Sequence, residues 1–125
     1  MKKTEMLKKN YEFKKVLSRG KFFSKERIDI VILKNNKNLN FLGIAVSKKN
    51  GKAFQRNRAK RLIREAYKVL ENKLISGNNI VILLRKNFNI KNLTFKDVLY
   101  EMEELFKEAK IIKKEDVLWK KYVYI

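Results

Sequence analysis

Two strand-length segments rich in apolar residues flank one long amphipathic segment, and this pattern constrains the fold more than any other feature. The first segment covers residues 41–47 and the second covers residues 80–84. Between them, residues 53–74 place apolar side chains at helical spacing. Because a crossover through a helix joins parallel strands, the pattern predicts a strand–helix–strand unit. Its second strand is apolar throughout, as in strands buried on both faces, and general chirality favours a right-handed crossover.

The N-terminal third is predicted to add one short helix and two strands. Asn10 is a suitable N-cap and Gly20 is a suitable residue after the helix end, with an apolar stripe between them. Residues 21–34 indicate a short strand and then a longer one, and the polar residues 35–38 indicate a hairpin loop into the next strand. Within that next strand, Gly43 marks a bulge or a close backbone approach.

A long amphipathic helix is predicted from Thr94 to Ala109, and Thr94 with Asp97 resembles a capping box at its start. The expected fold class is therefore α+β, an α/β sandwich with the order α-β-β-β-α-β-α and a small mixed sheet. A chain of 125 residues rarely divides, so residues 1–125 are expected to form a single RNA-binding domain. Residues 110–125 are a C-terminal extension that could continue the helix, add an edge strand or cover the core.

The net charge of +19 comes from 32 Lys and Arg against 13 Asp and Glu, and two segments hold most of the excess. Residues 1–28 carry ten basic and three acidic side chains, and residues 44–68 carry nine basic side chains and one acidic. Residues 94–125 carry seven of each sign. Because so large a net charge makes a compact chain repel itself, a polyanionic partner is expected, and nucleic acid is the leading candidate.

The predicted helix at 53–74 carries cations around its start and along its polar face. Four of the seven Arg lie between positions 56 and 64, and Arg offers a planar fork that matches phosphate. The free N–H groups and the dipole of a helix N-terminus also attract phosphate. We therefore predict a site for an RNA or DNA backbone, with a merely solvated helix as the alternative. Its residues are Lys48, Lys49, Lys52, Arg56, Asn57, Arg58, Arg61, Arg64 and Lys68.

Five phenylalanines invite a comparison with proteins that stack unpaired bases on aromatic rings. They are Phe13, Phe22, Phe23, Phe41 and Phe54. Aromatic side chains at such spacing usually belong to a core, and most of these five are expected there. Phe13 lies next to Lys14 and Lys15 and has the best claim to a mixed basic and aromatic surface.

The sequence offers no obvious catalytic or metal-binding group. It contains no His and no Cys, which removes Ser-His triads, thiol nucleophiles and zinc sites built from those ligands. The carboxylates of the last helix are expected on a solvated face, and Asp29 is alone in its strand. Those helix carboxylates are Glu101, Glu103, Glu104 and Glu108. No apolar run approaches the ~20 residues that span a bilayer, so a cytoplasmic protein without membrane contact is expected.

Residues 46–65, VSKKNGKAFQRNRAKRLIRE, closely resemble the signature of the bacterial ribonuclease P protein component. The resemblance implies an α/β sandwich with a left-handed crossover, against the general rule. It also implies a protein that binds a large catalytic RNA subunit, which with Mg²⁺ removes the 5′ leader from precursor tRNA. The protein then contributes leader binding, metal affinity and substrate discrimination. It supplies no catalytic residue and no recognisable metal site of its own.

The same resemblance assigns residues to two surfaces. The helix that meets the RNA subunit contains Arg56, Asn57, Arg58, Lys60, Arg61 and Arg64, and the groove for the single-stranded leader contains Phe13, Lys14, Lys15, Val31 and Leu33. Two positions depart from the family pattern. Phe54 stands where a smaller aliphatic residue is usual, and Leu17 stands where an aromatic residue is frequent.

Two other interpretations compete with this one. A structural RNA-binding protein of the ribosomal-protein type would show the same charge and the same cationic helix. A stand-alone metal nuclease is disfavoured because His is absent and the carboxylates are unclustered. The length and specific spacing of the motif favour the ribonuclease P interpretation, and no protein partner is evident.

Overall fold

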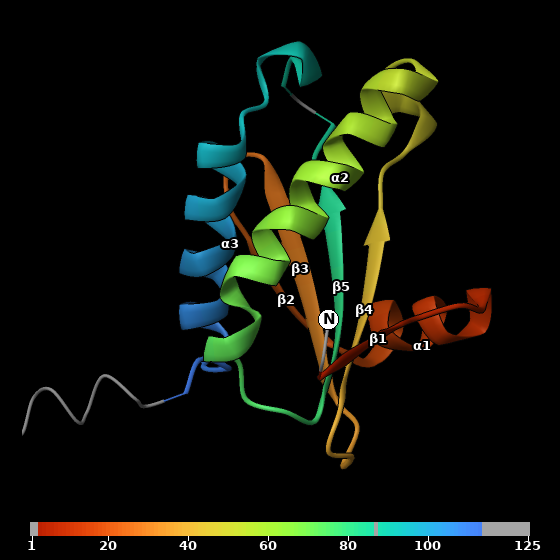
Figure 1. Ribbon diagram of the computed structural model, residues 1–125. Helices are drawn as coiled ribbons and strands as arrows, with labels where there is room; N and C mark the ends of the chain where they lie inside the picture. The colour runs from red at the N-terminus through yellow and green to blue at the C-terminus, as the bar shows by residue number, and fades with distance from the viewer. Residues whose placement is uncertain (1–2, 87, 114–125) are drawn as a thin grey trace, which may run out of the picture.

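The computed structural model describes residues 3–86 and 88–113. They form one five-stranded sheet in the order β1-β4-β5-β3-β2, with helices on both faces. Figure 1 shows α2 and α3 in front of the sheet and α1 behind it. The elements are β1 (Thr4–Met6), α1 (Asn10–Arg19), β2 (Lys21–Ser24), β3 (Ile28–Lys34), β4 (Asn40–Ala45), α2 (Ala53–Leu70), β5 (Asn78–Leu84) and α3 (Phe95–Glu108).

The central strands are apolar because both of their faces are covered. Ile28, Ile30 and Ile32 of β3 point towards α2 and α3 and belong to the main core. Val31 points to the opposite face, where it packs with Val16 of α1 in a smaller cluster. The prediction that residues 80–84 form a strand buried on both faces is confirmed, since β5 contributes side chains to both clusters.

β5 lies between β3 and β4, parallel to β4 and antiparallel to β3. The predicted hairpin between β3 and β4 is therefore wrong, because β5 lies between them, although the polar loop exists where expected. Asn35 in that loop donates its backbone N–H to the carbonyl of Gly77, so the loop crosses the start of β5. The physical reason is burial, because the most apolar strand gains two pairing partners and two covered faces only at the centre of the sheet.

The β4–α2–β5 crossover is left-handed. Both strands point upward in Figure 1, α2 lies in front of them, and β5 lies to the left of β4. The general expectation of a right-handed connection is thus wrong here, and the expectation from the family resemblance is confirmed. The predicted helix at 53–74 also ends earlier, since α2 stops at Leu70 and a short 3-10 turn, Glu71–Lys73, follows it.

β1 is the strand that the sequence did not predict. It is three residues long and pairs in parallel with β4 at the edge of the sheet. Thr4 shares a hydrogen bond of 2.7 Å with the hydroxyl of Tyr67 on α2, and burial raises the pKa of Tyr67 to about 12. This contact fixes the N-terminal segment to α2 before the chain turns into α1. The residue before α1 is Lys9, so Asn10 is the first helical residue rather than the N-cap.

The C-terminal helix α3 lies where the sequence predicts it. Thr94 accepts the backbone N–H of Asp97 at 3.1 Å, as the capping pattern predicts. Beyond α3, Ile112 pairs with Leu74 in an isolated bridge. The predictions for the C-terminal extension from residue 114 onward fall outside the described residues. Among the helices described, none has the length and apolar character required to cross a membrane.

Glu101 is buried, and its expected place on a solvated face is wrong. Its side chain is only 5% exposed and accepts the backbone N–H groups of Arg27 and Ile28 at 2.8 and 3.1 Å. Arg27 Nη1 donates to the second carboxylate oxygen at 2.6 Å, and this hydrogen bond raises the pKa of the Arg27 guanidinium. The carboxylate therefore joins α3 to the turn between β2 and β3.

Replacing Glu101 with Ala should lower the free energy of unfolding by about 2–3 kcal/mol, because two buried backbone donors and one guanidinium lose their acceptor. Glu104→Ala, on the same helix but more exposed, should change it by less than about 0.5 kcal/mol. Urea unfolding followed by circular dichroism measures both. Equal and small losses would show that Glu101 does not hold α3 to the sheet.

Candidate nucleic-acid interface

The loop before α2 has a fixed shape that leaves its lysines in solvent. Ser47 Oγ accepts the backbone N–H of Lys49 at 3.2 Å, which starts a 3-10 turn, and Gly51 ends it at a φ of 142°. The buried side chain of Asn50 donates to the carbonyl of Arg85 at 2.8 Å, so the loop is tied to the end of β5. Lys48, Lys49 and Lys52 remain exposed around the start of the helix.

The N-terminus of α2 is open to an anion. The backbone N–H of Lys52 donates to Gln55 Oε1 at 2.9 Å, which satisfies one donor with a neutral side chain. No acidic residue lies in the first turn, so no carboxylate of the helix competes for the positive end of its dipole. Phosphate is the ligand that such a terminus favours.

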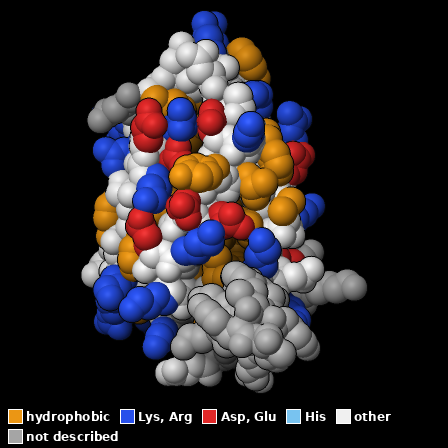
Figure 2. Space-filling model, turned by 90° about the vertical axis from the view of Figure 1, so that its left-hand side faces the viewer, with side chains coloured by type: hydrophobic (Ala, Val, Ile, Leu, Met, Phe, Trp, Pro, Cys, Tyr) orange, Lys and Arg blue, Asp and Glu red, His pale blue; other side chains and the backbone are white. Residues whose placement is uncertain are grey.

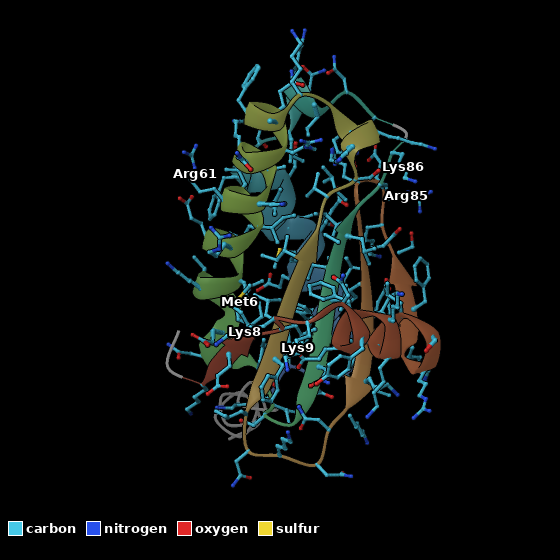
Figure 3. All side chains as sticks on the ribbon, turned by 90° about the vertical axis from the view of Figure 1, so that its right-hand side faces the viewer. Met6, Lys8, Lys9, Arg61, Arg85 and Lys86 are labelled. Atoms are coloured by element: carbon cyan, nitrogen blue, oxygen red, sulfur yellow. The ribbon has the colours of Figure 1, made fainter. Side chains whose placement is uncertain are left out.

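The predicted polar face of α2 is exposed as expected. Its apolar side packs into the core through Ala59, Leu62, Ile63, Ala66 and Leu70. The opposite side places Asn57, Arg58, Arg61, Arg64 and Lys68 in solvent, with Arg56 and Lys60 half-buried. Figure 3 shows Arg61 projecting outward from α2. Among the described residues, this face holds one long ion pair of 4.0 Å, between Arg61 and Glu65, so most of its charge is available to a partner.

The face of α3 is different, because its charges are compensated. Lys25 pairs with Glu108, Lys73 with Glu103, and Lys107 with Glu103 and Glu104. Figure 2 shows basic and acidic side chains intermixed on this side of the molecule. The electrostatic attraction for a polyanion is therefore concentrated on other faces.

A second candidate surface lies where α1 packs against the sheet. The ring of Phe13 lies directly over Gly43, and a Cβ on that glycine would approach Phe13 Cε1 to 2.5 Å. The expected close approach at Gly43 is thus confirmed. Phe13 is partly buried, so it is neither a full core residue nor free in solvent, while Lys14 and Lys15 are exposed.

Leu33 and Val31, which were also assigned to the leader groove, differ in their exposure to solvent. Leu33 is partly buried and, with Lys15 and Phe41, lines a hollow of about 280 Å³ beside α1. Val31 is only 3% exposed, and its side chain fills the space against Gly20 beneath the end of α1. The assignment of Val31 to direct RNA contact is therefore corrected, because it supports the surface from below.

Sequence reasoning missed two groups on the same side of the sheet, the exposed ring of Phe22 and the basic pair Arg85 and Lys86. Phe22 is 60% exposed, and its pairing with Val31 places it on the α1 face, although most phenylalanines were expected in the core. Arg85 donates to Ser24 and pairs with Asp29 at 3.4 Å, so Asp29 is not alone. Figure 3 shows Arg85 and Lys86 at one end of this side and Lys8 and Lys9 nearer to α1. The sequence signal that could have revealed this basic surface is the pair Arg85 and Lys86, which directly follows the apolar strand at residues 80–84.

These surfaces can bind a polyanion and offer no evident means of cutting it. Among the residues that the structure describes, no three His, Cys, Asp or Glu side chains gather where they could hold a metal ion. The fold and its basic surfaces define a small α+β RNA-binding protein. Many cations face outward, and most of the described carboxylates are engaged in ion pairs and hydrogen bonds.

Comparisons with known proteins identify the family. The family described as Ribonuclease P matches residues 1–110. The Ribonuclease P protein component of Clostridioides difficile is 42% identical over 110 residues, which cover 87% of this chain and 95% of that protein. The solved RNase P protein of Staphylococcus aureus has a TM-score of 0.74 at 31% identity and covers 86% of this chain and 97% of its own. That of Thermotoga maritima has a TM-score of 0.76 at 29% identity, covering 83% and 96%.

The chain belongs to the ribonuclease P protein component family. It is a protein subunit of the endoribonuclease that matures the 5′ end of tRNA, and it works with an RNA subunit.

Replacing Arg58, Arg61 or Arg64 with Ala should each weaken binding to ribonuclease P RNA. Every lost phosphate contact should remove about 0.7–0.9 from the slope of log affinity against log salt concentration. Filter-binding titrations at several salt concentrations measure this slope. Lys113→Ala, in the neutral C-terminal region, is the control. Equal losses for Lys113 and Arg61 would show that diffuse charge, rather than the α2 face, carries the binding.

Proposed function

We propose that the exposed face of α2 binds the catalytic RNA subunit and that the α1 side of the sheet binds the single-stranded 5′ leader of precursor tRNA. Each surface has the chemistry that its RNA requires. The α2 face offers arginine forks and an open helix N-terminus, which suit a phosphate backbone without reading bases. The α1 side combines exposed lysines with accessible aromatic rings, which suits unpaired bases.

The observation that carries the leader assignment is the position of Phe13. Its ring rests on the backbone of Gly43, so it is held in place without being enclosed, and Lys14 and Lys15 extend beside it. A supported, partly open ring next to cations is the arrangement found where single strands stack on proteins. Phe22 adds an exposed ring farther along the same face.

We also propose that Mg²⁺ acts with the RNA subunit. The donor set of the described chain does not suit a protein-bound magnesium ion, which prefers carboxylate oxygens, because the carboxylates lie apart or are paired with Lys and Arg. The protein contributes positive charge that offsets phosphate repulsion, and this lowers the concentration of Mg²⁺ that the particle needs. Its place of action is then the cytoplasm, where bacterial tRNA is processed.

A structural RNA-binding protein of the ribosomal type would use the α2 face in the same way but would have no need for a leader surface. Selective binding of precursor over mature tRNA therefore separates the two functions, since only the precursor carries the leader.

Phe13→Leu should weaken binding of precursor tRNA to the assembled enzyme by about 1–3 kcal/mol and leave mature tRNA almost unaffected, because a stacking contact to the leader is lost. Leucine lacks the ring atoms Cε1 and Cζ that lie nearest to Gly43, but it keeps an apolar side chain at this partly buried position, so the protein should stay folded. Equilibrium binding to both tRNAs, together with thermal melting, decides the matter. A large fall in melting temperature with equal losses for both tRNAs would place Phe13 in the core and remove the leader surface's stacking residue.

A further inference from the structure

A cavity of about 900 Å³ lies at the end of the sheet opposite the start of α2. The end of β3, the segment at residues 75–78 and the C-terminal end of α3 enclose it. Its apolar wall includes Phe23, Ile32, Ile75 and Ile111, and the backbone N–H of Ile75 donates to the carbonyl of Ile111 at 2.7 Å. The cavity is therefore built from segments that hydrogen bonds already hold together.

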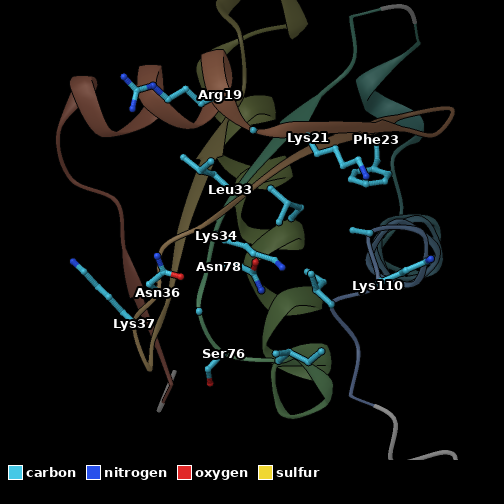
Figure 4. Close-up of a pocket in the computed structure, with 16 residues that line it drawn as sticks. Arg19, Lys21, Phe23, Leu33, Lys34, Asn36, Lys37, Ser76, Asn78 and Lys110 are labelled. Carbon is cyan, nitrogen blue, oxygen red and sulfur yellow. The ribbon is translucent and has the colours of Figure 1, made fainter.

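The residues that line this cavity carry positive charges that no acidic residue of the lining balances. The lining includes Arg19, Lys21, Lys34, Lys37 and Lys110, and it includes no carboxylate. None of these five side chains takes part in an ion pair within the described parts of the chain. In Figure 4, Lys34 points towards α3 and Lys21 lies beside Phe23, whereas Arg19 and Lys37 extend away on the other side of the sheet. Lys21 and Lys34 are thus the cations best placed for a ligand in the cavity.

Asn78 supplies a polar group that the fold does not use. The residue is only 5% exposed and is paired in register with Lys34, so both side chains are on the same face of the sheet. Its side-chain amide forms no hydrogen bond with another described residue, although its backbone N–H donates to Asn40 Oδ1 at 2.9 Å. A buried amide that lacks a protein partner and lines a cavity offers a ligand both a donor and an acceptor.

We propose that this cavity binds one unpaired nucleotide of an RNA strand. Its volume far exceeds that of an inorganic phosphate and is within the range of sites for organic ligands. The apolar wall with Phe23 suits a base, the amide of Asn78 suits a base edge, and Lys21 and Lys34 suit the phosphate. A nucleotide unites these features, and RNA is the polyanion with which this family works.

The cavity borders the hollow beside α1, because Leu33, Lys34, Asn36 and Lys37 line both, but it lies apart from Phe13 and from the start of α2. β5 has seven residues, so at about 3.3 Å per residue its ends lie roughly 20 Å apart, with the start of α2 near one end and the cavity at the other. A nucleotide bound at the start of α2 therefore cannot also occupy the cavity, and a second nucleotide of the same RNA would have to do so. The inference does not depend on the leader assignment, because neither Phe13 nor α2 lines the cavity.

The test is a titration of the ¹⁵N-labelled full chain with adenosine 5′-monophosphate, followed by NMR. Saturating shifts are expected for the amides of Lys34, Gly77, Asn78 and Ile111, with an affinity at least fivefold above those of adenosine and of inorganic phosphate. A single-stranded hexa-adenylate should shift the same amides at lower concentration. Shifts only on α1 or α2, equal affinity for phosphate alone, or no response of these amides to the hexa-adenylate would overturn the proposal.

Variants make the result specific. Lys21→Ala and Lys34→Ala should each weaken adenosine 5′-monophosphate binding by about three- to fivefold, the effect of losing one partly exposed charge contact. Lys96→Ala removes the same charge at the other end of α3 and should leave the affinity unchanged. Phe13→Leu should also leave these shifts unchanged, which separates failure of this site from failure of the leader surface. Equal losses of affinity for Lys34→Ala and Lys96→Ala would show that the overall positive charge, rather than the cavity, accounts for the binding, and would contradict the proposal.

Discussion

The pairing of β5 with both β3 and β4 is the interaction on which the rest of the structure depends. Because β5 is apolar on both faces, it is stable only at the centre of the sheet with helices on either side. The connection from β4 must then cross the sheet with α2 on the same face as α3, and it does so with the left-handed sense. This arrangement leaves the polar side of α2 and its N-terminus in solvent, beside the loop that Asn50 ties to the end of β5.

The same framework separates charge across the molecule. The carboxylates of α3 are used in ion pairs and in the contact between Glu101 and Arg27, so the helix that closes the core is electrically balanced. Apart from the long contact between Arg61 and Glu65, the cations of α2, of its preceding loop and of the cavity at the far end of the sheet lack such partners among the described residues. The large net charge therefore does not spread evenly over the surface. The uncompensated positive charge lies in several regions, and a long RNA can contact more than one of them. This explains how a protein with no catalytic cluster among its described residues can serve an RNA enzyme.

Periodicity and motif spacing were enough to predict α1, α2, α3 and the central strands, because each element is long enough to show the spacing of apolar residues that is typical of a helix or a strand. Strand pairing was not predictable in the same way. The polar loop after β3 has the residues of a hairpin, yet the global gain from burying β5 decides the sheet order. β1 escaped notice because three residues among lysines carry no apolar pattern. Glu101 and Val31 were misplaced for one reason, since periodicity gives the face of an element but not what covers that face. The exposure of the cationic face of α2 was predicted because the spacing of polar residues along a helix shows directly which face is turned to solvent.

In the assembled enzyme this protein supplies charge and binding surfaces, while the RNA subunit performs the cleavage. The most direct test measures cleavage of precursor tRNA as a function of Mg²⁺ concentration for the RNA subunit alone, for the protein alone and for the assembled enzyme. We expect no cleavage by ribonuclease-treated protein, and half-maximal activity of the assembled enzyme at a lower Mg²⁺ concentration than that of the RNA alone. Robust cleavage by the RNA-free protein, or an unchanged Mg²⁺ requirement on assembly, would contradict it.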